Sequence, residues 1–194
     1  MNLKLYLIII TIVAIITSLI TSFCFEISFI YVFGVMWLGI ILVIAIDGIT
    51  SAICRFLPKG CANFNSKIYL VSKKEKKFYD NIKIKSWKEK IPEIGHLTGF
   101  RKNKVIDPKN KDYIHRFLTE ICYGELGHFI SQFTGLLLLL LPFFKPIWVI
   151  LCIVIVVVNA ILNLLPLFVL RYNSYALLRV YERLIKNEAR QAKE

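Results

Sequence analysis

The chain has 194 residues, of which 57% are hydrophobic, and its 25 lysines and arginines against 13 aspartates and glutamates give a formal net charge of +12. Its mean hydropathy of +0.62 is far above that of ordinary soluble domains and excludes that class. The five cysteines are scattered without a C-x-x-C pair, which argues against a disulfide framework or a zinc site.

Four apolar segments are long enough to be considered as membrane-spanning helices. Their predicted bounds are residues 5–25, 29–46, 126–144 and 147–170. In the third segment the apolar run begins only at Phe129, so the helix must include the turn around Leu126 to be long enough to cross the bilayer. Lys145-Pro146 breaks the chain between the last two segments and predicts a helical hairpin. We therefore predict a single membrane domain, an all-α polytopic integral membrane protein with four transmembrane helices.

The distribution of lysine and arginine predicts the orientation of these helices. Residues 51–120 hold 17 of the 25 basic residues and 7 acidic ones, whereas the connection at 24–28 holds no basic residue. Because basic loops stay on the cytoplasmic side, we predict a cell-membrane protein with both termini and the loop 51–120 in the cytoplasm.

The basic loop and the chain end both show patterns typical of a membrane surface. In the loop, lysines alternate with apolar residues and Trp87, which suits a segment lying on anionic headgroups. The sharper interpretation is that Trp87, Lys88 and Lys90 bind a phosphate-bearing substrate. Nucleic acid is not predicted as a partner, because membrane topology explains the charge. Residues 174–194 predict an amphipathic interfacial helix, and Lys111–Tyr123 predicts a helix entering the third span.

Two carboxylates and an imidazole stand at the start of the third span, in the stretch EICYGELGHFISQF (residues 120–133). Glu125 and His128 are three residues apart and share a helix face, whereas Glu120 lies at a larger angle around the helix axis. A carboxylate near an imidazole fixes its tautomer and raises its basicity, as a general base acting on a hydroxyl requires. Alternatively, His128 hydrogen-bonds inside the bundle while both carboxylates face water. Spacing alone leaves both interpretations open.

Polar residues also interrupt the fourth span. Asn159 and Asn163 are four residues apart on one face, and Arg171-Tyr172-Asn173 follows at the cytoplasmic end. A hairpin of the last two spans would bring Arg171 and Asn173 to the same boundary as Glu125 and His128, although an arginine there is also typical of a headgroup anchor. No metal site is predicted, because no second E-x-x-H motif accompanies the first.

Three blocks in this order resemble the glycosyl-4,4'-diaponeurosporenoate acyltransferases of staphyloxanthin-type carotenoid synthesis. They are SWKEKIPEIGH at 86–96, the E-x4-E-L-x-H pattern formed by Glu120, Glu125, Leu126 and His128, and NLLPLFVLRYN at 163–173. The resemblance covers roughly residues 55–180.

The resemblance implies transfer of a fatty-acyl group to a sugar hydroxyl of a membrane lipid, with acyl-CoA as donor substrate and no bound cofactor. His128 oriented by Glu125 would be the base, with Glu120 beside them. Arg171, Trp87, Lys88 and Lys90 would meet the donor phosphates, and Asn163 or Asn173 would donate to the oxyanion. The alternatives are a non-catalytic protein that binds, transports or scaffolds lipids, and a transferase with a polyprenyl or nucleotide-linked donor.

Overall fold

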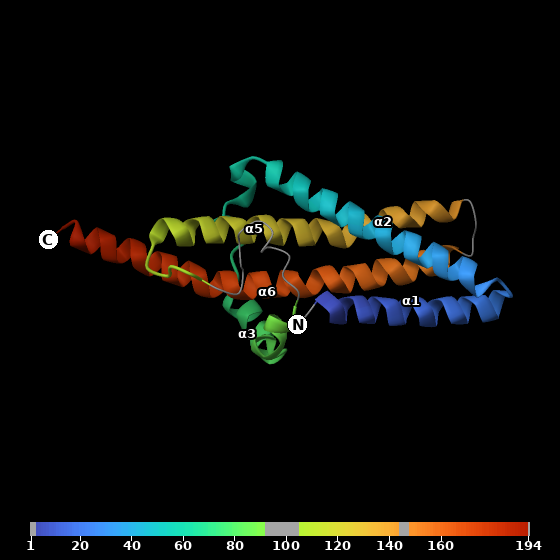
Figure 1. Cartoon of the computed structure of the whole chain (residues 1–194). Helices are drawn as coiled ribbons and strands as arrows, with labels where there is room; N and C mark the ends of the chain where they lie inside the picture. The colour runs from blue at the N-terminus through green and yellow to red at the C-terminus, as the bar shows by residue number, and fades with distance from the viewer. Residues whose placement is uncertain (1–2, 92–104, 144–147, 194) are drawn as a thin grey trace. The chain divides into compact units, whose positions relative to one another are not determined.

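The computed structural model describes residues 3–91, 105–143 and 148–193, and Figure 1 shows this part of the chain as a set of helices. No strand occurs among these described residues. The longer helices are α1 (Leu3–Phe25), α2 (Phe29–Phe56), α5 (Lys111–Thr134) and α6 (Trp148–Gln191). The shorter ones are η1 (Lys59–Ala62), α3 (Lys73–Asn81), α4 (Ile84–Trp87), η2 (Lys88–Lys90) and η4 (Gly135–Phe143). The predicted all-α class is confirmed.

Three helices are long and apolar enough to cross a membrane: Tyr6–Phe25 within α1, the whole of α2, and α6. They correspond to the first, second and fourth predicted segments, so the chain is a membrane protein. The third predicted segment, 126–144, is divided between the end of α5 and the 3-10 helix η4. A span in that part of the chain stays a prediction.

Two helices continue beyond the segments predicted for them. Helix α2 passes residue 46 and includes Asp47 before ending at Phe56. Helix α6 continues through Pro166 to Gln191, where the sequence predicted a span ending at 170 and a separate tail helix over 174–194. The helix predicted at Lys111–Tyr123 is confirmed by α5. The predicted break at Lys145-Pro146 lies outside the described residues.

The chain forms two compact units. Unit 1 comprises Met1–Cys54 and Gly127–Leu165, and unit 2 comprises Arg55–Leu126 and Pro166–Glu194. Each has a hydrophobic core of its own. The core of unit 1 is built from α1, α2, η4 and α6: Ala14, Val32, Met36, Ile40, Val43, Leu138, Leu151, Cys152 and Ile155. That of unit 2 is built mainly from α5, α6 and the segment after α2: Ala62, Phe64, Tyr69, Ile114, Phe117, Leu118, Ile121, Cys122, Leu170 and Leu177.

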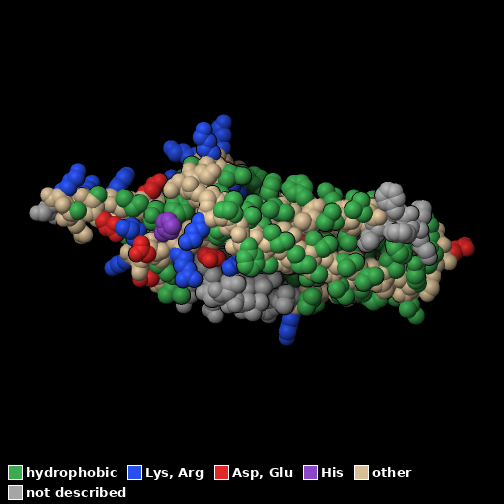
Figure 2. Space-filling model, turned by 90° about the horizontal axis from the view of Figure 1, so that it is seen from above, with side chains coloured by type: hydrophobic (Ala, Val, Ile, Leu, Met, Phe, Trp, Pro, Cys, Tyr) green, Lys and Arg blue, Asp and Glu red, His purple; other side chains and the backbone are tan. Residues whose placement is uncertain are grey.

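The helices of unit 1 pack closely and leave apolar side chains on the outside. At Gly39 a Cβ atom would lie 2.6 Å from Cδ1 of Ile155, so the glycine permits the close approach of α2 and α6. Ile8, Ile44 and Ile153 are about half exposed. Figure 2 shows hydrophobic side chains over most of the visible surface of α1 and α2. A surface of this kind is suited to the hydrocarbon interior of a bilayer.

Unit 2 carries the charged surface of the described chain, and Figure 2 shows Lys, Arg, Asp and Glu side chains gathered over it. Lys111 of α5 pairs with Glu188 of α6 at 2.6 Å between Nζ and Oε2. Helix α3 begins with Ser72 as its N-cap, whose hydroxyl accepts a hydrogen bond from the Glu75 N–H at 3.1 Å. This cap fixes Glu75 in the first turn of α3.

Candidate functional site

Three side chains of unit 1 form a continuous hydrogen-bonded chain on α5, α6 and α2. Nδ1 of His128 lies 3.0 Å from Oδ1 of Asn163, and Nδ2 of Asn163 donates to Oδ2 of Asp47 at 2.8 Å. Asn163 is buried, whereas His128 and Asp47 are partly exposed. An imidazole, an amide and a carboxylate are thus connected in sequence.

The hydrogen bonds of Asn163 assign the tautomer of His128. Besides Asp47, Nδ2 of Asn163 faces two acceptors of Asn159, the backbone oxygen at 3.2 Å and Oδ1 at 3.1 Å. The amide nitrogen therefore points to these acceptors, and Oδ1 must face the ring as an acceptor. Nδ1 of His128 is consequently the protonated nitrogen, and in the neutral ring Nε2 carries the lone pair.

A second layer of polar groups holds this chain in place. Thr134 donates to Oδ1 of Asp47 at 3.1 Å, so both carboxylate oxygens of Asp47 accept a hydrogen bond. Nδ2 of Asn159 donates to the backbone oxygen of Ser131 at 3.1 Å. The predicted shared face of Asn159 and Asn163 is confirmed by their mutual hydrogen bond. Buried polar networks of this kind fix a side-chain geometry when their members are satisfied.

In unit 2, Arg171 of α6 is held between two carboxylates. It forms a bidentate pair with Glu75, with 2.5 Å from Nε to Oε1 and 3.0 Å from Nη2 to Oε2. Its Nη1 donates to Oε2 of Glu125 at 2.9 Å and to the backbone oxygen of Ile68 at 3.0 Å. Tyr79 also donates to Oε1 of Glu75, at 2.6 Å. The guanidinium group thus joins α3, α5 and the segment between η1 and α3.

The two carboxyls around Arg171 differ in protonation. Burial raises the pKa of Glu75, but the hydrogen bonds from Arg171 and Tyr79 and the charge of Arg171 outweigh it, and the pKa lies below its usual value. For Glu125, burial dominates over Arg171 and raises the pKa to about 8. Arg171 and Tyr79 therefore favour the charged form of Glu75, whereas burial shifts Glu125 toward its protonated form.

Glu125 also borders a small pocket of unit 2. Its side chain is 3% exposed, and Oε1 has no hydrogen-bond partner among the residues that the structure describes. The pocket has a volume of about 20 Å³, room for at least one water molecule, and is also lined by Tyr69, Ser174 and Tyr175. A hydrogen-bonding group entering this pocket would meet a protonatable carboxyl.

The remaining predicted residues lie in unit 2. Nζ of Lys88 donates to Oδ1 of Asn173 at 3.1 Å, while Nε1 of Trp87 donates to the backbone oxygen of Ile82 at 3.0 Å. Lys90 is exposed. Glu120 faces Arg55 at 3.3 Å in a partly exposed ion pair, a type that contributes little to stability.

The structure thus divides the predicted site residues into two groups. It gives His128 the partner Asn163, and it gives Glu125 the partner Arg171. Glu125 and His128 lie in different units, so the orientation of His128 by Glu125 stays a prediction. A site that these two residues share with Arg171 and Asn173 also stays a prediction. The oxyanion role of Asn163 also stays a prediction, because its Nδ2 already donates to Asp47 and Asn159.

The sequence analysis missed Asp47, Ser131, Thr134 and Glu75. Asp47 is an ionisable residue inside an apolar helix, a signal that indicates function, but the predicted second segment ends just before it, at residue 46. Glu75 lies within the lysine run KKEKK, where no spacing distinguishes it from a solvated charge. Within the described ranges, no three His, Cys, Asp or Glu side chains gather as a metal-binding group.

In a comparison with protein families, the chain matches the model described as glycosyl-4,4'-diaponeurosporenoate acyltransferase over residues 63–183. This range is more than half of the chain, and it contains His128, Asn163, Glu75 and Arg171 but not Asp47. Comparison with curated proteins and with solved structures finds no match.

Proposed function

Because the chain belongs to the glycosyl-4,4'-diaponeurosporenoate acyltransferase family, a family of carotenoid biosynthesis, we propose that it is a membrane-bound O-acyltransferase. It moves a fatty-acyl group from a thioester donor, acyl-CoA, to a sugar hydroxyl of a glycosylated membrane lipid. The observation that carries this proposal is the hydrogen-bonded chain of His128, Asn163 and Asp47 in a protein with membrane-spanning helices.

In the proposed reaction His128 is the general base. Its Nε2 takes the proton of the sugar hydroxyl while the hydroxyl oxygen attacks the thioester carbonyl carbon. The tetrahedral oxyanion collapses, the carbon–sulfur bond breaks, and the leaving thiolate takes the proton back from the imidazolium. The products are an ester and a free thiol.

Asn163 and Asp47 are positioning residues in this mechanism. Asn163 holds the Nδ1–H of His128, which keeps Nε2 as the basic nitrogen throughout the cycle. Asp47 fixes the amide of Asn163, and its negative charge favours the imidazolium that forms during proton transfer. The same logic of a base oriented by a third group recurs in unrelated acyl-transfer enzymes.

The donor and the location complete the proposal. In unit 2, we assign Lys88 and Lys90 to the phosphates of acyl-CoA, because Lys90 is exposed and the ammonium of Lys88 has further N–H groups besides the one that Asn173 accepts. The basic segment 51–120 and both termini lie in the cytoplasm, where acyl-CoA is present, and the partners of the protein are lipids of the cell membrane.

Lipid mass spectrometry on cells that make the wild type, His128→Ala or His128→Gln at equal membrane levels tests this function. Gln at this position can still donate to Asn163, but it cannot act as a base. We expect one lipid to gain the mass of one fatty-acyl group with the wild type and with the exposed control His115→Gln, and with neither His128 variant. Identical lipidomes would favour a binding or scaffold protein instead.

A further inference from the structure

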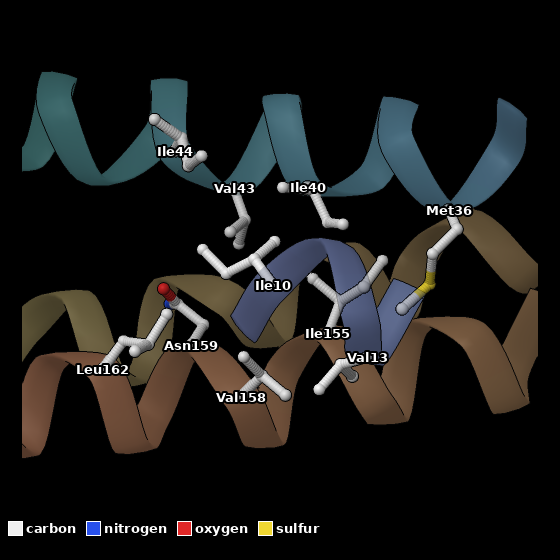
Figure 3. Close-up of a pocket in the computed structure, with 10 residues that line it drawn as sticks. All are labelled: Ile10, Val13, Met36, Ile40, Val43, Ile44, Ile155, Val158, Asn159 and Leu162. Atoms are coloured by element: carbon white, nitrogen blue, oxygen red, sulfur yellow. The ribbon is translucent and has the colours of Figure 1, made fainter. Parts of the chain in front are cut away.

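Unit 1 contains an apolar pocket between α1, α2 and α6 (Figure 3). Nine of its ten lining residues are apolar, and its volume is about 40 Å³. Figure 3 shows Met36, Ile40 and Val43 of α2 opposite Ile155 of α6, with Ile10 of α1 beside them. All three helices that form it are apolar enough to cross a membrane. A hydrocarbon is therefore the ligand class that this lining suits.

The single polar residue of the pocket connects it to the candidate base. Asn159 lines the pocket, and its Oδ1 accepts from Nδ2 of Asn163, whose Oδ1 faces His128. Ile155, Asn159 and Asn163 follow one another at intervals of four residues on one face of α6. At about 1.5 Å per residue, this face covers about 12 Å from the apolar lining to the partner of the imidazole.

Asn159 also has a side-chain N–H group that can donate a hydrogen bond at that end of the pocket. Its Nδ2 carries two hydrogens, and among the described residues the acceptor it reaches is the backbone oxygen of Ser131, at 3.1 Å. The second N–H suits a carbonyl oxygen. A fatty-acyl thioester has this combination, a carbonyl at one end and a hydrocarbon chain behind it.

We propose that this pocket binds the first carbons of the donor's fatty-acyl chain, with the carbonyl end toward Asn159 and the following methylenes toward Ile155. The inference rests on the proposed function, because it names the place of the transferred group. Ile155 narrows the pocket beyond these carbons, since it is buried and its Cδ1 fills the space opposite Gly39, so it restricts how far the chain can extend. A single methylene in such a pocket changes selectivity by about tenfold or more.

The test compares the acyl chains of the lipid product from full-length wild type, Ile155→Ala and Ile155→Phe in membranes supplied with saturated acyl-CoA donors of graded length. We expect Ile155→Ala to raise the ratio of long-chain to short-chain product about tenfold and Ile155→Phe to lower it. Ile153→Ala on the exposed face of the same helix is the matched control and should keep the wild-type ratio. An unchanged ratio in both Ile155 variants, with normal product yield, would overturn the inference but not the proposed function.

Photocrosslinking separates the donor from bilayer lipid as occupant, whether or not product is formed. A diazirine on the acyl chain of acyl-CoA should label the segments around Met36 and Ile155, and unlabelled acyl-CoA should compete. Labelling by a diazirine phospholipid that acyl-CoA does not displace would show that the pocket holds bilayer lipid, and would overturn the inference.

Discussion

Asp47→Asn isolates the charge of Asp47 from its hydrogen bonds. In the wild type, the two carboxylate oxygens accept from Thr134 and from Asn163. In the variant, the introduced amide oxygen can still accept from Asn163. Its NH2 group can donate to the hydroxyl of Thr134, whose single hydrogen then turns to the backbone oxygen of Ser131, 3.1 Å away. The substitution therefore keeps the geometry and removes one negative charge.

The size of the effect follows from the strengths of these bonds. A hydrogen bond to a charged group contributes about 1.5–3 kcal/mol, and one between neutral groups about 0.5–1.5 kcal/mol. Losing the charge thus weakens the stabilisation of the imidazolium by about 1–1.5 kcal/mol. This corresponds to a rate reduced by about 5–13-fold. Asp47→Ala should cost more, because it leaves the donors of Asn163 and Thr134 without this acceptor.

The assay is acyl transfer from radiolabelled acyl-CoA to extracted glycosylated lipid, in membranes matched for protein level. We expect kcat to fall with Asp47→Asn, KM for the donor to stay near the wild-type value, and the exposed control Asp80→Asn to behave as wild type. Full activity in both Asp47→Asn and Asp47→Ala would refute the positioning role of Asp47.

Three further predictions concern unit 2. Arg171→Lys should destabilise the fold by about 2–4 kcal/mol in denaturant titrations, because an ammonium cannot replace the fork that binds Glu75 and Glu125. Burial raises the pKa of Glu125 from 4.5 to about 8, so the folded chain binds this proton more tightly than the unfolded chain does. The resulting stabilisation is fully present below pH 4.5 and is lost as the pH rises through 8. The melting temperature should thus fall more steeply from pH 6 to 9 in the wild type than in Glu125→Gln. Lys88→Ala should raise the KM for acyl-CoA about fivefold, because one lost contact between an ammonium group and a phosphate weakens binding by about 1 kcal/mol. The KM for the lipid should stay unchanged.

Each of these has a result that would contradict it. Equal stability of Arg171→Lys and the control Arg179→Lys would contradict the first prediction. The side chain of Arg179 is exposed and, among the described residues, contacts only Tyr175. Parallel melting curves of wild type and Glu125→Gln across the pH range would contradict the burial argument. A KM for acyl-CoA in Lys88→Ala equal to that in Lys85→Ala, an exposed neighbour, would remove Lys88 from donor binding.

The apolar helices could be predicted from the sequence because length and hydropathy are local properties. The bounds of α2 and α6 could not, because Asp47 and Pro166 are usual signs of a helix end, and here both lie inside a helix. Transmembrane helices tolerate such residues where neighbouring groups satisfy them. For Asp47 those groups are Thr134 and Asn163.

The partners of the candidate site residues were harder to predict than the residues themselves. His128 and Asn163 were each identified as polar residues at membrane depth, but they are 35 positions apart and no spacing rule pairs them. Helix periodicity favours Glu125 as the partner of His128, whereas the hydrogen bond from Arg171 to Glu125 depends on the folding of unit 2. Long-range pairing of this kind comes from tertiary packing, which short sequence patterns do not encode.

The most direct test of the proposed function uses purified full-length protein in lipid nanodiscs with acyl-CoA and a glycosylated carotenoid. Release of free CoA thiol and formation of the ester product are measured together for the wild type and His128→Gln. The proposed mechanism predicts equal amounts of thiol and ester from the wild type and almost none from the variant. Ester formation by His128→Gln at the wild-type rate would contradict His128 as the base, and no ester from either protein would contradict acyl transfer itself.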